Sequence, residues 1–110
     1  MGTNKVASKN LSLIYQNIEP NLELKLFVSG QLTYLLEKCP NSSSLSAKIV
    51  DLENHYLVQL NLVTDRDLLF AHGEDEVIAS ALDSAVAELT SQLIDWNQKA
   101  MDADYDYENF

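Results

Sequence analysis

Hydrophobic residues dominate four short stretches of the chain, and in three of them they recur at every second residue, which is the period of a strand with one buried face. The first stretch covers residues 11–18, and two others, 45–50 and 56–63, lie on either side of a short break at Glu53-Asn54. The fourth is a short run over residues 68–72. Because so short a break separates the second and third stretches, we expect them to form an antiparallel hairpin.

Two longer stretches have hydrophobic positions three or four residues apart, which is typical of a helix packed on a core. The first covers residues 22–38 and stops at Pro40, since proline cannot continue a helix. Gly30 lies in its middle, where glycine costs ~1 kcal/mol relative to alanine. We therefore expect Gly30 to mark a close approach of this helix to the sheet. The second helix follows Gly73, with its stripe at Ile78, Leu82, Ala85, Leu89, Leu93 and Trp96.

Three carboxylates, Glu74, Asp75 and Glu76, stand where the first turn of the second helix is expected. Negative charge there is stabilised by the helix dipole, and a carboxylate can cap free N–H groups. The predicted order is β-α-β-β-β-α, an α+β two-layer sandwich with two helices on one face of a four-stranded sheet. Residues 11–99 would form this domain, between a flexible N-terminal tail (1–10) and an acidic, aromatic C-terminal tail (100–110) that is disordered or loosely docked.

The charge of the chain is concentrated in its second half. The 110 residues carry a net charge of −10, yet the bases and acids of residues 1–55 balance, and residues 56–110 have only Arg66 and Lys99 against twelve acids. Such a field disfavours non-specific binding to nucleic acid, and it also describes a solubilising surface. A lone cysteine and the lack of a long apolar run favour a cytoplasmic protein that does not cross a membrane.

Motifs of enzymes and cofactor sites are missing from the sequence. It has no Gly-rich phosphate loop, no Gly-x-Ser-x-Gly and no Cys-x-x-Cys. Cys39 is expected to be a buried hydrophobe, and two distant histidines, His55 and His72, make a poor metal set with it. We therefore expect no enzymatic activity, metal or cofactor. A catalytic role would require a deep pocket lined by Asp65, Asp67 and His72.

The second helix also carries a specific spacing. Ser80-Ala81-Leu82-Asp83 is followed by Gln92-Leu93, and in the hairpin Val50-Asp51 precedes His55. Together with the element order, this pattern over residues 10–99 resembles the ribosome hibernation-promoting and ribosome-associated inhibitor proteins, also called sigma-54 modulation proteins. The resemblance implies a factor that binds the small ribosomal subunit between head and body, over the tRNA and mRNA path. Such factors silence translation when growth stops, and their lysines and arginines face rRNA phosphates.

The sequence departs from this family where the family carries its bases. The second helix has Glu88 and Asp95 there, and the first has Gln31 and Tyr34. Since each phosphate contact contributes through counterion release, a chain with few bases should bind rRNA weakly. The candidate rRNA or ribosome contacts that remain are Lys25, Lys38, Lys48, Arg66 and Lys99.

Two functions are consistent with these observations. The first is a ribosome-associated translation modulator on the small subunit, which would use those bases against rRNA or an acidic surface against basic ribosomal proteins. The second is an acidic protein–protein interaction domain that kept the fold and lost rRNA binding. Its candidate contacts with a basic partner are Asp83, Glu88 and Asp95. Homodimerisation by strand pairing at an open sheet edge is a further hypothesis.

Overall fold

The elements of the chain follow the predicted order β-α-β-β-β-α. The computed structural model describes residues 9–108, with side chains as far as Asn97, so residues 1–8 of the predicted N-terminal tail lie outside the described residues. The elements are β1 (Asn10–Gln16), α1 (Leu22–Glu37), β2 (Ser44–Asp51), β3 (Tyr56–Val63), β4 (Leu68–Asp75) and α2 (Ile78–Glu108). The α+β fold class predicted from the hydrophobic pattern is confirmed.

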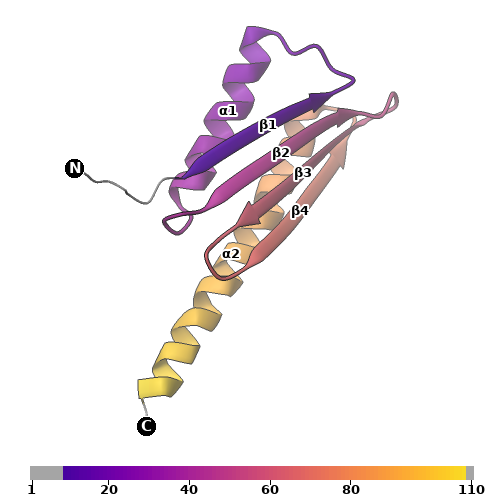
Figure 1. Ribbon diagram of the computed structural model, residues 1–110. Coiled ribbons are helices and arrows are strands. Elements are labelled where there is room, and N and C mark those ends of the chain that lie inside the picture. The colour runs from indigo at the N-terminus through magenta and orange to yellow at the C-terminus, as the bar shows by residue number, and fades with distance from the viewer. Residues whose placement is uncertain (1–8, 109–110) are drawn as a thin grey trace, which may run out of the picture.

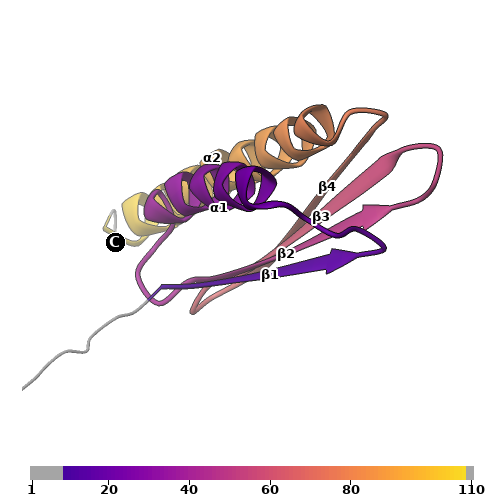
Figure 2. The same ribbon diagram turned by 90° about the horizontal axis from the view of Figure 1, so that it is seen from above.

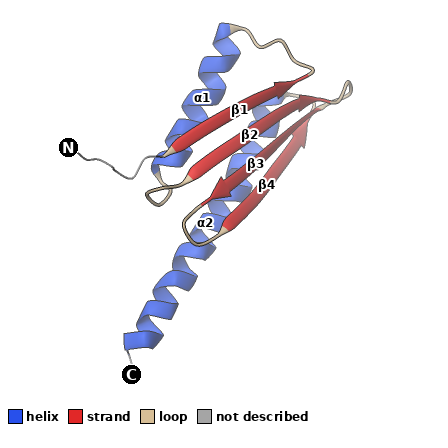
Figure 3. Ribbon diagram, viewed as in Figure 1, coloured by secondary structure: helices blue, strands red, loops and turns tan. Residues whose placement is uncertain are grey.

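The four strands form one sheet in the order β1-β2-β3-β4 (Figures 1 and 3). β1 and β2 are parallel, because α1 returns the chain to the starting end of the sheet between them. β2–β3 and β3–β4 are antiparallel neighbours, and the expected hairpin is confirmed with Asp51 opposite Tyr56 at its closed end. β1 and β4 are therefore the two edges of the sheet.

Both helices cover the same face of the sheet (Figure 2). α1 packs on the β1 side, whereas α2 packs on β3 and β4. Alternate residues of each strand point into the layer between helices and sheet, as the two-residue strand period requires. The fully buried large side chains of this core are Leu32, Leu45, Ile49, Leu60, Leu62, Leu82 and Leu89.

The carboxylates before α2 do not occupy its first turn, and that prediction was wrong. Pairing with β3 carries β4 as far as Asp75, opposite Tyr56, so the helix starts only at Ile78. Glu74 lies 2.8 Å from the ring of His55 (Oε1 to Nε2). Asp75 Oδ1 accepts the N–H of Val77 at 2.9 Å, in the turn that leads into the helix. Two of the three acids therefore stabilise the end of β4 and the turn.

Only one of the two helix-associated glycines marks a close approach. Gly30, which was expected to do so, has no atom within 4 Å of the position of a side-chain Cβ. A Cβ on Gly73 of β4 would instead lie 2.7 Å from the backbone nitrogen of Ala85, and it would also collide with the carbonyl oxygen of Ala81. Gly73 is thus the position where α2 packs directly on the sheet.

α2 is longer than the hydrophobic pattern of the sequence predicted. Its backbone continues to Glu108 and projects past the sheet (Figure 1), through most of the segment 100–110 that was expected to be a loose tail. Residues 109–110 lie outside the described part of the chain. Among the described residues, neither α1 nor α2 contains an apolar stretch of the length that a membrane span needs.

Candidate interaction surface beside α2 and β4

Side chains of α2 bind the outer backbone edge of β4. Glu88 Oε1 accepts the N–H of His72 at 2.7 Å, and one helical turn later the side-chain amide of Gln92 donates to the carbonyl of Phe70. Residues four apart lie on the same side of a helix, so the two side chains reach successive outward-facing groups of the strand. An exposed strand edge is a template for pairing with another chain. Glu88 and Gln92 satisfy two of the outward-facing backbone groups of β4.

Glu88 and Gln92 therefore have roles within the fold, as side chains that bind the edge of β4. Glu88 stood out in the sequence as an acid in place of a base, but the structure gives it an intramolecular partner, with its Oε1 also 3.8 Å from His72 Nδ1. Gln92, noticed only as part of a family-like spacing, acts in the same way. The signal available in the sequence was a pair of polar residues, four apart, on the flank of an apolar stripe. Dimerisation by strand pairing at a sheet edge stays a prediction.

An acidic hollow lies one turn further along α2. Trp96 Nε1 donates to Asp67 Oδ2 at 2.8 Å, across the start of β4. Asp67, Leu69, Gln92, Asp95 and Trp96 line this hollow, whose volume is about 290 Å³. Asp67 and Asp95 are both exposed, whereas Trp96 and Leu69 are half-buried. Two carboxylates beside an aromatic and an aliphatic wall suit the apolar stem and charged end of a lysine or arginine.

The three predicted acidic contacts do not form one row. Glu88 and Asp95 are seven residues apart, about two turns, and therefore share the β4 side of α2. Asp83 follows Ala79 by one turn, and Ala79 lines a separate hollow with Leu24 and Phe27 of α1. Asp83 therefore lies on the α1 side of the helix, and only Glu88 and Asp95 belong with the acidic hollow.

The predicted basic contacts are scattered over the molecule. Lys25 lies near the start of α1, and Lys38 at its C-cap places its amine 4.3 Å from the centre of the Tyr34 ring. Lys48 stands on β2 opposite Gln59, on the sheet face away from the helices. Arg66 is exposed in the β3–β4 turn, and Lys99 belongs to the part of α2 whose side chains are not described. The described residues therefore bring no group of these bases together on one surface.

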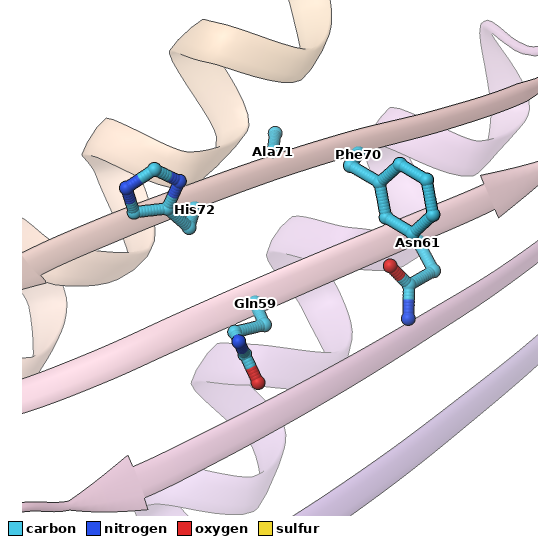
Figure 4. A pocket seen from close by; sticks show the side chains of 5 residues that line it. All are labelled: Gln59, Asn61, Phe70, Ala71 and His72. Atoms are coloured by element: carbon cyan, nitrogen blue, oxygen red, sulfur yellow. The ribbon is translucent and has the colours of Figure 1, made fainter.

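The open face of the sheet carries a second hollow. Gln59 and Asn61 of β3 and Phe70, Ala71 and His72 of β4 line it, and its volume is about 370 Å³ (Figure 4). Asp65 and Asp67 are not among these residues, so this hollow is not the pocket of Asp65, Asp67 and His72 that a catalytic role would require. Nor do the described residues include a group of three or more side chains able to hold a metal ion.

Cys39 is buried at the end of α1, as predicted. Its thiol donates to the carbonyl of Leu35 at 3.4 Å. Burial raises the pKa of the Cys39 thiol, an effect partly offset by the positive charge of Lys9. Burial likewise raises the pKa of Tyr15, whose hydroxyl is enclosed without a hydrogen-bond partner among the described residues. Because the thiolate is the reactive form, Cys39 acts as a packing residue and a poor nucleophile.

Comparison with known structures shows the fold. A ribosomal subunit interface protein from Coxiella burnetii superposes with a TM-score of 0.70 at 14% identity, over 81% of this chain and 98% of that one. The N-terminal domain of Protein Y from Thermus thermophilus gives a TM-score of 0.65 at 20% identity, over 74% of this chain and 90% of that domain. No protein-family model and no curated protein sequence matches the chain. The fold implied by the resemblance is thus confirmed, while family membership remains a prediction.

Proposed function

We propose that this protein is a ribosome-associated translation modulator that binds the small ribosomal subunit. The observation that carries the proposal is its two-layer fold, which is similar over nearly the whole length of two structures named for the ribosomal subunit interface and for Protein Y. The Asp83…Gln92-Leu93 spacing in α2 is a second, independent support from the sequence.

The binding mode that fits this chain is contact with basic ribosomal proteins. Phosphate recognition needs several lysines or arginines on one surface, whereas the candidate bases with described side chains lie on α1 and its C-cap, on the far face of the sheet and in a turn. The acidic hollow instead offers two exposed carboxylates, Asp67 before β4 and Asp95 on α2, beside each other. A net charge of −10 would speed association with a positively charged ribosomal protein and oppose the approach of rRNA.

Sedimentation with purified small subunits tests the proposal. We expect the protein to migrate with the subunit in a sucrose gradient at about 50 mM salt and to dissociate as the salt is raised to about 300 mM, because screening weakens an interface between exposed charges. A protein that stays at the top of the gradient at low salt, also with ribosomes from stationary-phase cells, would contradict it.

The acidic hollow also supports a second candidate, an acidic protein–protein interaction domain that acts away from the ribosome. A basic segment can occupy the space beside Asp95 and Trp96 whether or not it belongs to a ribosomal protein. In that case the gradient would show no co-migration, and an affinity column would retain a basic protein that Asp95→Lys releases. Retention that is unaffected by both salt and Asp95→Lys would count against this candidate.

A further inference from the structure

The face of the sheet opposite both helices is nearly free of charge (Figure 2). The strand register places four rows of residues across the four strands on this face, sixteen positions in all. Among these positions only Lys48, His72 and Glu74 have charged or titratable side chains, and Glu74 already lies 2.8 Å from His55. The others are amides, hydroxyls and apolar side chains. Although the chain has a net charge of −10, a small anion therefore meets little repulsion from this face.

The hollow on this face is lined by two pairs of side chains. On β3 and β4, Asn61 lies opposite Phe70, and Gln59 lies opposite His72 (Figure 4). The side chain of Phe70 is 59% exposed and that of His72 is 63% exposed, so both rings offer aromatic surface to a ligand. The amides beside them supply hydrogen-bond donors and acceptors. Aromatic rings next to such polar groups are what proteins use to stack and hydrogen-bond an unpaired nucleobase.

The backbone that carries the two rings is held by the neighbouring elements. Gln92 of α2 donates to the carbonyl of Phe70, and Glu88 accepts the N–H of His72. Both strand residues also pair with β3 on their other side. The positions of the two rings are therefore largely set before a ligand arrives, and binding loses less conformational freedom.

The size of the hollow and the charge of the chain favour a single nucleotide over a strand of nucleic acid. A volume of about 370 Å³ is near the lower end of the range for small-molecule pockets, roughly 300–1,000 Å³. Lys48 stands in the same row as Gln59 and His72, so it can reach a phosphate attached to a base in the hollow. A polyanion requires several such bases and is opposed by the net charge of −10, whereas one phosphate group requires fewer.

We propose that this hollow binds a nucleoside monophosphate. The base stacks on the ring of Phe70, the amides of Asn61 and Gln59 bond to the edge of the base, and the amine of Lys48 neutralises the phosphate. The acidic hollow beside Trp96 lies on the helix side of the sheet, so the nucleotide site does not rest on the proposed function.

An NMR titration of the full isotope-labelled chain with AMP, CMP, GMP and UMP, up to about 10 mM, tests the site. We expect saturable shifts of amide signals from β3 and β4, with a Kd of about 1 mM or below for at least one nucleotide. Phe70→Ala should raise that Kd at least about tenfold because stacking is lost, whereas Phe70→Tyr keeps the ring and should stay within about twofold. Leu68→Ala is the matched control, since Leu68 is an exposed apolar residue of the same strand and face outside the hollow, and its Kd should also stay within about twofold.

Lys48→Gln separates recognition of the phosphate from recognition of the base. It should weaken binding of the monophosphate about two- to fivefold, as expected for an exposed ion pair, and leave binding of the corresponding nucleoside unchanged. Melting temperatures equal to that of the parent would show that Lys48→Gln and Phe70→Ala are folded.

Three results would overturn this inference. The absence of a saturable shift with all four nucleotides at the highest concentration would mean that the hollow takes no such ligand. A Kd that Phe70→Ala leaves unchanged would place the nucleotide on another surface. A single-stranded RNA oligonucleotide that binds at least about tenfold more tightly than the mononucleotide, with a steep salt dependence, would make this face a surface for RNA. The ribosome experiment depends on Asp95 of α2, so the two proposals can fail separately.

Discussion

α1 and α2 pack on the same face of one sheet, yet their outer sides have different compositions. α2 turns polar side chains toward β4, where Glu88 and Gln92 bind the strand edge, and carries further exposed acids such as Asp95. α1 has exposed apolar residues on its outer side, such as Leu22 and Leu26. The inner stripes therefore account for the shared fold, while the outer sides decide which partners the molecule can bind.

The largest difference in unfolding free energy is expected between variants of Gly73 and variants of Gly30. Gly73→Val should destabilise the protein by about 3 kcal/mol or more, since its side chain would collide with the backbone of α2 at Ala81 and Ala85. Gly30→Ala in dilute protein should stabilise it by about 0.5–1 kcal/mol, because the added methyl group meets no atom and favours the helix. Urea unfolding of both variants measures the difference. Equal effects would mean that α2 does not pack on β4 at Gly73.

The inner and outer sides of α1 provide the next contrast. Leu32 is fully buried, so Leu32→Ala should cost about 2–5 kcal/mol through lost burial and a residual cavity. Leu26→Ala, on the opposite side of the helix, should change the unfolding free energy of the monomer by less than about 0.5 kcal/mol. A large loss of monomer stability in Leu26→Ala would show that the outer side is covered within the chain.

Removal of the Glu88 side chain, which binds the outer edge of β4, should have a smaller effect on stability. Glu88→Ala leaves the N–H of His72 without its partner and should cost about 1 kcal/mol in chemical unfolding. Asp83→Ala, with no hydrogen bond to the sheet edge, should stay within about 0.5 kcal/mol. Light scattering at high concentration should also show more association for Glu88→Ala, because its β4 edge is open. Identical unfolding curves for the two variants would remove the capping role.

The smallest predicted effect is a loss of folding stability at alkaline pH. Burial raises the pKa of Cys39 above its value in the unfolded chain, so unfolding releases a proton once the pH exceeds the unfolded value. The stabilisation is complete below the unfolded pKa and is lost as the pH rises through the folded pKa. Cys39→Ala should therefore lose less stability than the parent between neutral and alkaline pH. Parallel pH profiles would show that Cys39 makes no contribution.

The hydrophobic periods were enough to predict the order of elements and the hairpin, because residues such as Leu45, Leu60 and Leu82 must share one buried layer. The same periods do not report how a helix is rotated and positioned over the sheet. For that reason the close approach was assigned to Gly30 when it lies at Gly73. The length of β4 depends on its pairing with β3, so the roles of Glu74 and Asp75 were also missed.

The candidate surface was partly predictable. The sequence alone showed that the second helix has acids, Glu88 and Asp95, where the family it resembles carries bases. Both residues lie on the same side of α2. The partners of Glu88, Gln92 and Trp96 were not visible, because His72, Phe70 and Asp67 become their neighbours only when β4 and α2 pack together. The hydrophobic pattern along one helix or strand indicates which of its faces is buried. Hydrogen bonds to a strand edge and surface hollows form between elements that lie far apart in the sequence.

Charge reversal on each helix tests the central claim, that the acidic side of α2 rather than the bases of α1 contacts the small subunit. Binding of Asp95→Lys and Lys25→Glu to purified small subunits at low salt is the measurement. We predict that Asp95→Lys weakens binding by at least about tenfold, or about 1.4 kcal/mol, and that Lys25→Glu leaves it unchanged. Weakened binding in Lys25→Glu, with Asp95→Lys unchanged or tighter, would contradict the account and indicate contact with rRNA.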